Sequence, residues 1–315
     1  MTIMISGRKL LEAIRETAEK VKRLEIRGAR NIAIAAINAV EALARQTKAG
    51  NKSSFLHELL EAKKVLFASR ETEPLMRNAV RRIISQVEKS PEENVESLVK
   101  IVSAAAKQFL KDLEDSKEKI AEIGAKRILD DSVVLTHCHS STVTHLLRKA
   151  KGKGKSFEVV CTETRPFLQG RITARELLNS GIKTTLIVDS AARFFMNDVD
   201  LVIVGADAIT SEGNVVNKIG TSTIALIAKE ARTPFYVASE LLKFDPATIY
   251  GGYEKIEERN PEEVWKNPPE GLVIRNPVFD VTRRDFIHGI ICEEGIISPH
   301  SIIEVMRRRY PWIFG

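Results

Sequence analysis

Beyond about residue 125, short runs of β-branched residues alternate with stretches of helical spacing. Strands that alternate with helices build a parallel, doubly wound sheet, so this rhythm limits the fold class more than any other feature. The expected strands cover residues 133–136, 157–161, 184–188, 201–204, 234–238 and 271–274. The expected helices lie near residues 142–149, 173–179, 190–195 and 222–229. We therefore predict a Rossmann-like α/β domain over residues 125–315.

The preceding part of the chain shows helical periodicity instead. Apolar residues recur at helical spacing in five segments: Leu10, Leu11, Ile14, Ala18 and Val21; Ile32, Ala35, Ala36, Ala39, Val40 and Leu43; Leu56, Leu59, Leu60 and Val65; Met76, Val80, Ile83, Ile84 and Val87; Leu98, Ile101, Val102, Ala105 and Leu110. Ser90 followed by Pro91 and two acidic residues predicts the start of the fifth helix, which should run to near Gly124. We predict an all-helical domain over residues 1–124.

Length and composition set outer limits on the function. The 315 residues suffice for about two domains. No stretch approaches the roughly 20 apolar residues of a membrane span, and residues 1–8 lack the apolar core of a signal peptide. We therefore expect a cytoplasmic protein with no membrane contact.

The three cysteines are widely separated and include no CxxC pair. This spacing argues against a disulfide framework and against a zinc site, so we predict no metal. Cys161 and Cys292 follow apolar residues and are interpreted as small buried side chains.

The formal net charge of +6 fits either a nucleic-acid binder or a cleft for an anionic small molecule. No basic run is interleaved with aromatic residues, which make up only 6% of the chain, so nucleic acid is disfavoured. The basic run 149–155 is followed by a strand rather than a helix, which excludes a phosphate-binding P-loop.

A thiol and a carboxyl each follow a predicted strand. Cys138 comes after the first strand, and Asp207 comes after the fourth. Because the carboxyl ends of strands in a parallel sheet line the ligand crevice, the two side chains should face one cavity. One group that takes a proton and another that gives one are what an isomerase needs. Taken alone, Asp207 is as well explained as the cap of a turn.

The turn after the first strand leads into a helix whose amino terminus favours anions. This position should lower the pKa of Cys138 and help Ser140, Ser141 and Thr142 to hold a phosphate. An ordinary turn with a capping serine explains the same residues. His137 and His139 have no partners for a metal site in the sequence, so we interpret them as hydrogen-bonding groups.

Further cations follow other strands of the same sheet. Arg165 is either a phosphate ligand or the ion-pair partner of Glu163, with equal weight. Asn217 and Lys218 precede a helix start and suit a phosphate or sugar hydroxyls, and Lys243 follows the fifth strand. Each residue alone is weak evidence for a binding site, but all of them fall at the carboxyl edge of one predicted sheet.

The helical domain also carries loops with arginine. Arg27, Gly28, Ala29 and Arg30 form one such segment, and Arg70 lies in another. Structure at the domain boundary explains both. If the helical domain folds over the cleft, they would instead help to bind a doubly anionic ligand.

The segments LTHCHSS, ETRP with the following Gln169 and Gly170, DLVIVGAD, NKIGT and PFYVASELLKFD carry a family resemblance. They resemble the family that joins the regulatory subunits of translation initiation factor 2B with sugar-phosphate isomerases. RGAR and SRETEP, nearer the amino terminus, match as well, so the resemblance covers most of the chain.

Three classes of that family differ at the positions of Cys138 and Asp207 and in the residues that follow them. Regulatory subunits typically lack the cysteine and the aspartate, whereas methylthioribose-1-phosphate isomerases typically read HCNAG and GADRI. The chain is most similar to the archaeal ribose-1,5-bisphosphate isomerases, and Lys243 agrees with a second phosphate. That resemblance implies substrate contacts from a larger set: Arg27, Gly28, Ala29, Arg30, Arg70, Asn217, Lys218 and Lys243.

The resemblance implies conversion of ribose 1,5-bisphosphate to ribulose 1,5-bisphosphate in nucleoside monophosphate breakdown. Cys138 as thiolate would remove the proton on carbon 2, and Asp207 would protonate the ring oxygen. The thiol pKa must then fall, and the carboxyl must keep its proton in a cleft closed from water. No metal or organic cofactor is required. Activation by AMP and assembly of dimers into a hexamer are family expectations. The alternatives are a methylthioribose-1-phosphate isomerase and a non-catalytic regulatory subunit.

Overall fold

The structure is a computed structural model that describes residues 11–70, 72–252 and 256–314. The chain forms two compact units, Met1–Glu114 and Asp115–Gly315. The division falls inside one long helix, α6 (Val95–Ala125). The sequence places the boundary later in the same helix, after residue 124, because helical spacing continues to its end.

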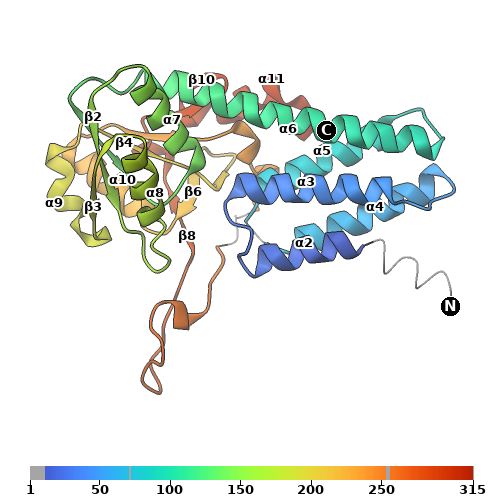
Figure 1. Cartoon of the computed structure of the whole chain (residues 1–315), viewed down its shortest axis with the longest axis horizontal. Coiled ribbons are helices and arrows are strands. Elements are labelled where there is room, and N and C mark those ends of the chain that lie inside the picture. Colours follow the sequence, from blue (N-terminus) through green and yellow to red (C-terminus); the bar gives the residue numbers. More distant parts are fainter. Residues whose placement is uncertain (1–10, 71, 253–255, 315) are drawn as a thin grey trace. The chain divides into compact units, whose positions relative to one another are not determined.

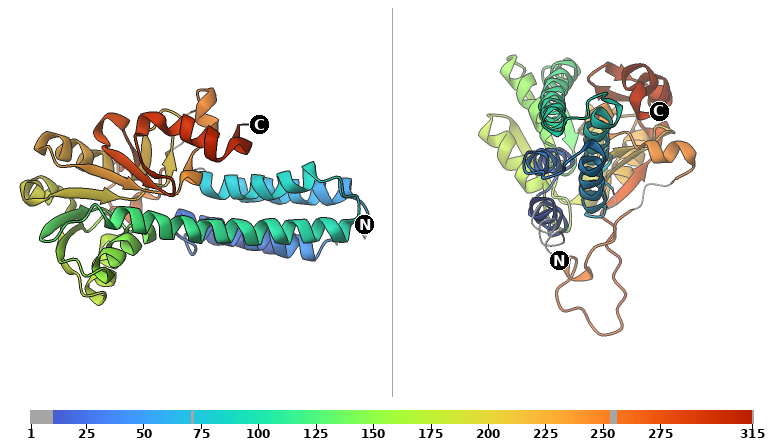
Figure 2. Two further views of the ribbon diagram at one scale, coloured as in Figure 1. Left: turned by 90° about the horizontal axis from the view of Figure 1, so that it is seen from above. Right: turned by 90° about the vertical axis from the view of Figure 1, so that its right-hand side faces the viewer.

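The first unit is built from helices, as predicted. Besides the first part of α6 it contains α2 (Glu12–Lys22), α3 (Ala29–Arg45), α4 (Lys52–Phe67) and α5 (Pro74–Lys89). α3 and α4 pack against each other, and each also packs against α2 and α5 (Figures 1 and 2). The apolar face of α3, which includes Ile32, Val40 and Leu43, is fully buried. Leu10, assigned to the first apolar face, lies outside the described residues.

Two details of the helical prediction are wrong. In α4, Phe55, Leu59, Ala62 and Leu66 form the buried face, whereas Leu56, Leu60 and Val65 are only half-buried. The buried face therefore shares Leu59 with the predicted face but otherwise consists of different residues, among them the large, fully buried Phe55. The fifth helix begins at Val95 rather than near Ser90, because the Asn94 side chain accepts the Ser97 N–H at 3.0 Å and caps it there.

The second unit is centred on a seven-stranded sheet with the order β10-β9-β7-β4-β1-β2-β3. The strands are β1 (Ser132–Thr136), β2 (Phe157–Thr162), β3 (Lys183–Ile187), β4 (Leu201–Val204), β7 (Phe235–Ala238), β9 (Gly289–Cys292) and β10 (Gly295–Ile297). All neighbouring pairs are parallel except β9 with β10. The predicted fold class is therefore confirmed.

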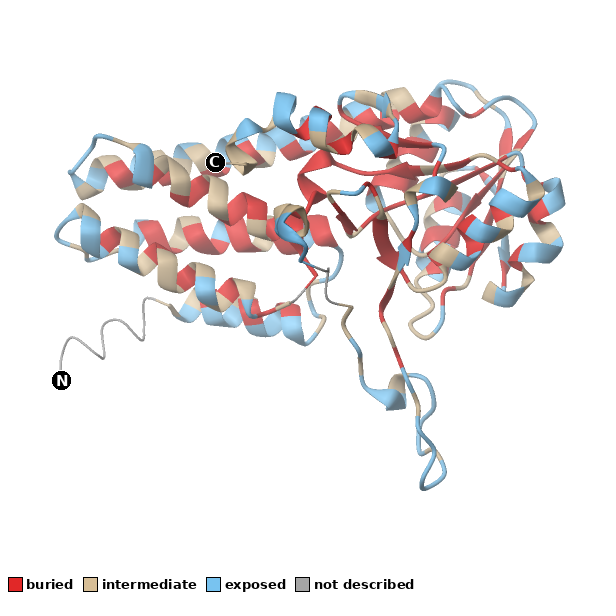
Figure 3. Cartoon of the chain, turned by 180° about the vertical axis from the view of Figure 1, so that it is seen from behind, coloured by how far each residue is buried: buried red, intermediate tan, exposed pale blue. Residues whose placement is uncertain are grey.

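Helices cover both faces of this sheet. Alternate strand residues belong to two separate cores: Val134 and Val159 pack with residues of α7 (Ser141–Gly152), whereas Leu135 and Val160 lie in the core that α10 (Thr221–Ala231) joins. The remaining helices are α8 (Gly170–Asn179), α9 (Ala192–Phe195) and α11 (Ile302–Arg309). Figure 3 shows the buried strands between these layers.

A small antiparallel sheet was not predicted. It consists of β5 (Ala208–Ile209), β6 (Val215–Lys218) and β8 (Phe279–Thr282) in the order β5-β6-β8. The predicted strand at 271–274 is wrong. That segment lies in a loop without strand structure (Figure 3), where Val273 is 82% exposed because no neighbouring strand covers it. Within the described residues, no helix is both long and apolar enough to cross a membrane.

Candidate active site

The direction in which the chain leaves the strands defines a topological switch point between β1 and β4. These strands are neighbours in the sheet, but β1 is followed by β2 on one side and β4 by β7 on the other. In open α/β sheets, ligands bind outside the carboxyl ends of the strands where the order reverses. Cys138 follows the end of β1, and Asp207 follows the end of β4. The two predicted catalytic residues therefore flank the switch point.

The loops after β1 and β4 also approach each other closely. A Cβ atom on Gly205 would lie 2.7 Å from Oγ of Ser140. Only a glycine permits this approach, which brings the segment of Asp207 against the segment of Cys138.

Cys138 has an unusual backbone conformation. Its φ is +67°, in the left-handed region that residues other than glycine rarely adopt. The N–H of Cys138 donates to Oγ1 of Thr164 at 2.9 Å, and its carbonyl accepts from Oγ1 of Thr173 at 2.8 Å. Two threonine hydroxyls therefore hold the peptide groups on either side of the thiol.

The electrostatic surroundings of the thiol differ from the expectation. The pKa of Cys138 is raised to about 11: burial has the largest effect, Lys218 and the His139 N–H oppose it, and the charges of Asp207 and Asp189 add to the rise. The predicted fall in the thiol pKa is therefore wrong for this structure, because burial outweighs the cation and the amide. The same effects show that Asp207 and Lys218 act on the thiol electrostatically.

The start of α7 has a capping role and a buried hydroxyl. Ser140 accepts from the Val143 N–H at 3.4 Å, so the ordinary capping interpretation holds for this residue. Thr142 is buried and donates to Oε1 of Glu240 at 3.3 Å, which directs its hydroxyl toward protein. Ser141 is exposed. A phosphate at Ser140, Ser141 and Thr142 stays a prediction.

The two histidines make hydrogen bonds within the unit. His137 is buried: its Nε2 lies 2.8 Å from the Ile219 carbonyl and its Nδ1 lies 2.5 Å from Oγ1 of Thr162. Burial lowers the pKa of His137, so the neutral ring donates through Nε2 and accepts through Nδ1. Nδ1 of His139 lies 3.1 Å from Oγ1 of Thr173. Across the described part of the chain, no group of three or more metal-ligating side chains gathers.

Lys218 and Asn217 lie at the end of β6, which the sequence did not reveal as a strand. Lys218 is 8% exposed, and its Nζ lies 5.2 Å from the centre of the Phe279 ring. The Asn217 amide donates to Oγ1 of Thr221 at 2.9 Å. Substrate contacts by this pair stay a prediction, and the effect of Lys218 on the Cys138 thiol supports one for the lysine.

The amino terminus of α10 is not open to an anion as expected. The Gly220 and Ser222 N–H groups donate to the Asp280 carboxylate, at 2.8 Å and 3.1 Å. Burial raises the pKa of Asp280 to about 6, against the opposing effect of these two amides. A carboxylate of the protein itself thus takes the place of the predicted phosphate.

Lys243 is a buried internal cation. Its Nζ lies 3.2 Å from Oε2 of Glu240 and donates to the Ala206 carbonyl at 2.8 Å. Because Ala206 immediately precedes Asp207, this bond supports the loop that carries the carboxyl. Contact of Lys243 with a second phosphate stays a prediction.

The ion-pair interpretation of Arg165 is wrong, whereas its contact with a phosphate stays a prediction. Glu163 pairs with Arg171 at 3.2 Å, and the exposed Arg165 guanidinium donates to the Val264 carbonyl at 2.8 Å. The sequence did not identify Arg171 as a partner because it lies beyond the turn, in the first turn of the following helix, α8.

In the helical unit, the predicted ligands make local contacts. Arg30 is buried, donates to the Leu113 carbonyl at 2.8 Å and forms an ion pair with Glu114. Arg27 is exposed and donates to the Leu24 carbonyl at 2.6 Å. Gly28 precedes α3 with a φ of +82°, and the buried Ala29 begins that helix.

Arg70 lies 3.4 Å from the fully buried carboxylate of Glu73. These contacts agree with structural roles for the arginines, and substrate contact by the helical unit stays a prediction.

Sequence reasoning missed Asp189, Thr164 and Thr173. Asp189 lies just beyond the carboxyl end of β3, and its carboxylate accepts the Thr164 and Arg165 N–H groups at 2.8 and 2.7 Å. The rule that identified Cys138 and Asp207, a polar residue after a strand of the sheet, would have identified Asp189 too. The same rule covers Thr164, which follows β2, whereas Thr173 lies inside α8 and carried no comparable signal.

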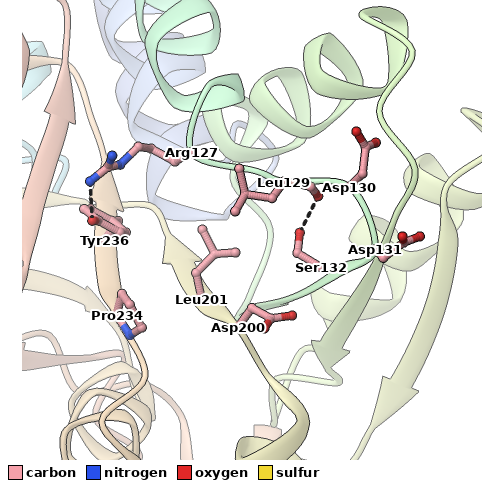
Figure 4. A pocket seen from close by; sticks show the side chains of 9 residues that line it. All are labelled: Arg127, Leu129, Asp130, Asp131, Ser132, Asp200, Leu201, Pro234 and Tyr236. Atoms are coloured by element: carbon pink, nitrogen blue, oxygen red, sulfur yellow. Dashed lines mark hydrogen bonds between the residues drawn. The ribbon is translucent and has the colours of Figure 1, made fainter.

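A separate pocket of about 310 Å³ lies at the opposite, amino-terminal edge of the sheet (Figure 4). It is lined by Arg127, Leu129, Asp130, Asp131, Ser132, Asp200, Leu201, Pro234 and Tyr236. Arg127 donates to the Tyr236 hydroxyl at 2.9 Å, and Asp200 accepts the Val133 N–H at 2.7 Å. None of the predicted site residues lines this pocket.

Comparison with known proteins places this arrangement in a family. The model of the Initiation factor 2 subunit family matches residues 25–299. The ribose 1,5-bisphosphate isomerase of Thermococcus kodakarensis is 42% identical over 310 residues, which cover 96% of this chain and 96% of the relative. The chain therefore belongs to the Initiation factor 2 subunit family, as its motifs predicted.

Solved structures of the family share the fold. A Pyrococcus horikoshii protein described as translation initiation factor eIF-2B has a TM-score of 0.80 and 35% identity, with 91% of this chain and 98% of that chain covered. The 5-methylthioribose 1-phosphate isomerase of the same organism has a TM-score of 0.76 and 30% identity, with 94% and 87% covered. Two of these three proteins are named isomerases, and the prediction of an enzyme of that kind is confirmed.

Proposed function

We propose that the chain converts ribose 1,5-bisphosphate to ribulose 1,5-bisphosphate, with Cys138 as the base and Asp207 as the acid. The observation that carries the proposal is that these two residues follow the ends of β1 and β4, the strands on either side of the switch point. The name of the Thermococcus kodakarensis relative supports the choice of substrate.

The substrate explains why an acid and a base are both needed. A phosphate on the anomeric oxygen prevents the ring from opening as a free hemiacetal does. The Cys138 thiolate takes the proton from carbon 2, the bond between carbon 1 and the ring oxygen breaks, and the ring oxygen takes the proton of Asp207. The resulting enol receives the thiol proton at carbon 1 and gives its hydroxyl proton to the Asp207 carboxylate. This yields the ketose and restores both groups.

The raised thiol pKa has a consequence for this chemistry. A thiol with a pKa of about 11 is almost entirely protonated at neutral pH, so few molecules carry the base form. Lys218 is the cation that favours the thiolate, because its charge lowers this pKa. Turnover should therefore rise with pH across the neutral range until another group limits it.

The proposal extends to properties that the family resemblance of the sequence implies. It includes a role in nucleoside monophosphate breakdown, activation by AMP, no metal or organic cofactor, and a cytoplasmic homo-oligomer in which dimers form a hexamer. The substrate anions would meet Lys218, with Lys243 released from Glu240 when a second phosphate binds.

The decisive experiment offers the purified chain two substrates. Ribose 1,5-bisphosphate and methylthioribose 1-phosphate are incubated separately, and ketose formation is followed. We expect conversion of the bisphosphate only. Conversion of the thio-sugar alone would move the assignment to the methylthioribose class, which the structural match to that isomerase favours as second candidate. Conversion of neither would support a regulatory subunit.

A further inference from the structure

Two residues of the candidate site have left-handed backbones. The φ of Cys138 is +67° and that of Thr164 is +65°. For a β-branched residue such as Thr164 this conformation is an outlier, and a residue in it persists only where the surrounding structure offsets the strain. The fold must therefore contain groups that hold both residues.

A chain of hydrogen bonds performs this task. The Asp189 carboxylate accepts the N–H groups of Thr164 and Arg165, one on each oxygen, at 2.8 and 2.7 Å. The hydroxyl of Thr164, which is fully buried, then accepts the Cys138 N–H at 2.9 Å. The end of β3 is thus linked through the loop after β2 to the thiol after β1.

On the other side of the thiol, Thr173 of α8 donates to the Cys138 carbonyl at 2.8 Å. The peptide groups before and after Cys138 are therefore fixed by two different elements. Rotation of either peptide group would move Sγ relative to Asp207 and Lys218.

We propose that Asp189 and Thr164 are positioning residues that fix the backbone of Cys138 and so place its thiol for proton transfer. This inference rests on the proposed role of Cys138 as base. Neither residue needs to touch the substrate: Thr164 acts through the Cys138 amide, and Asp189 acts through Thr164.

The charge of Asp189 argues against a role in activating the thiol. The groups whose charges reach Cys138 are Lys218 on β6, Asp207 after β4 and Asp189 after β3, and only the lysine lowers the thiol pKa. Asp189 opposes formation of the thiolate. The Asp189 carboxylate therefore makes the thiolate base harder to form. Its contribution to the site is structural, through the two backbone N–H groups that it accepts.

The test pairs a variant that loses a hydroxyl with one that keeps it. Thr164→Val preserves the β-branched shape and removes the acceptor, whereas Thr164→Ser keeps the acceptor and loses only a methyl group. We expect Thr164→Val to lower kcat roughly 100-fold with a much smaller change in KM, because a small misplacement of a reacting group has an effect of that size. Thr164→Ser should retain most of the activity.

Asp189→Asn separates position from charge. The asparagine can accept only one of the two N–H groups, so kcat should fall. The negative charge near the thiol is lost as well, so alkylation of Cys138 by iodoacetamide should reach its midpoint at a lower pH than in the wild type. A merely structural role would not produce this opposite movement of kcat and thiol acidity. Asp198→Asn, at an exposed aspartate of the same unit, is the control.

Several results would overturn the inference. One is wild-type kcat in Thr164→Val, and another is an equal loss in Thr164→Val and Thr164→Ser, which would assign the effect to packing. A third is Asp189→Asn with unchanged kcat or with a midpoint at higher pH. If Thr164→Val does not fold, Thr173→Val with Thr173→Ser asks the same question from the other side.

The positioning role can also be tested if the proposed isomerase function is wrong. If the wild type converts no sugar phosphate, the mass-spectrometric alkylation rate of the Cys138 peptide still reports on position, because it needs no substrate. The limiting rate at high pH should then change in Thr164→Val and match the wild type in Thr164→Ser. Equal limiting rates in all three proteins would remove the positioning role as well.

Discussion

The two edges of the seven-stranded sheet carry similar residue types in opposite settings. At the amino-terminal edge, the charged residues of the pocket (Figure 4) are all exposed: Arg127, Asp130, Asp131 and Asp200. At the carboxyl-terminal edge, the lysines are buried, and burial raises the pKa of Cys138 to about 11. Carboxylates accept backbone N–H groups at both edges, so hydrogen bonding alone does not distinguish them.

The difference lies in burial. At the amino edge the charged side chains are exposed, and the hollow there is lined by groups that bond their neighbours. Backbone conformation does not separate the edges, because Cys138 and Thr164 at the carboxyl edge and Asp131 at the amino edge all have left-handed backbones. Desolvated ionisable groups collect where a protein performs chemistry. The visible pocket is therefore a poorer guide to the site than the buried edge.

Removing the two proposed catalytic groups should have the largest effect. Cys138→Ser lacks an ionisable thiol and Asp207→Asn lacks a proton to give, so each should lower kcat for isomerisation roughly 10³-fold or more. Asp131→Asn is the matched variant at the amino edge, where the exposed side chain should contribute nothing to turnover. Ketose formation is measured together with thermal unfolding. Comparable losses in Asp131→Asn would contradict the distinction between the edges.

The sequence predicted the architecture well because periodicity depends on local patterns. Alternating β-branched and helical segments placed five strands of the main sheet and the helices between them. It failed for β9, β10, the small antiparallel sheet and the loop at 271–274. The apolar run at 271–274 resembles a strand in composition, but strand formation depends on a neighbour that the sequence does not reveal.

For the site, sequence reasoning identified residues but not their states. The position of Cys138 and Asp207 after strands follows from sheet topology. The thiol pKa was expected to fall because a helix start is visible in the sequence, whereas the burial that raises it is not. In the same way, Asp280 is distant in sequence from the start of α10, and its occupation of the Gly220 and Ser222 amides became apparent only in the structure.

Two glycines, one at each edge of the sheet, test whether the backbone is packed more closely at the carboxyl edge than at the amino edge. A Cβ atom on Gly170, at the carboxyl edge, would lie 1.7 Å from the Thr162 carbonyl oxygen, so Gly170→Ala must displace backbone. We expect a loss in the free energy of unfolding of about 3 kcal/mol or more. Gly154 precedes β2 at the amino edge with a φ of +85° and open space around it. Gly154→Ala should cost only about 1 kcal/mol, from the left-handed backbone.

Urea unfolding of both alanine variants measures the two losses. Equal losses would mean that the carboxyl edge adjusts as readily as the amino edge, and that its tight packing does not hold the site.

The smallest predicted effect concerns two carboxylates that both accept backbone N–H groups. Asp280 at the carboxyl edge is half-buried, and its pKa is raised from an ordinary 3.8 to about 6, chiefly by burial. Between these two values the folded state holds a proton that the unfolded state has lost. The free energy of unfolding should therefore fall as pH rises from about 4 to 6, by up to roughly 3 kcal/mol.

Asp280→Asn cannot ionise and should lack this part of the fall. The variant should therefore gain stability relative to the wild type between pH 4 and pH 8, even though its amide accepts only one of the two N–H groups. Asp200→Asn supplies the comparison from the amino edge, since Asp200 is exposed and also accepts a backbone N–H. Chemical unfolding at several pH values measures both. If Asp280→Asn follows the wild-type pH dependence, the carboxylate is hydrated after all, and burial no longer separates the edges at this position.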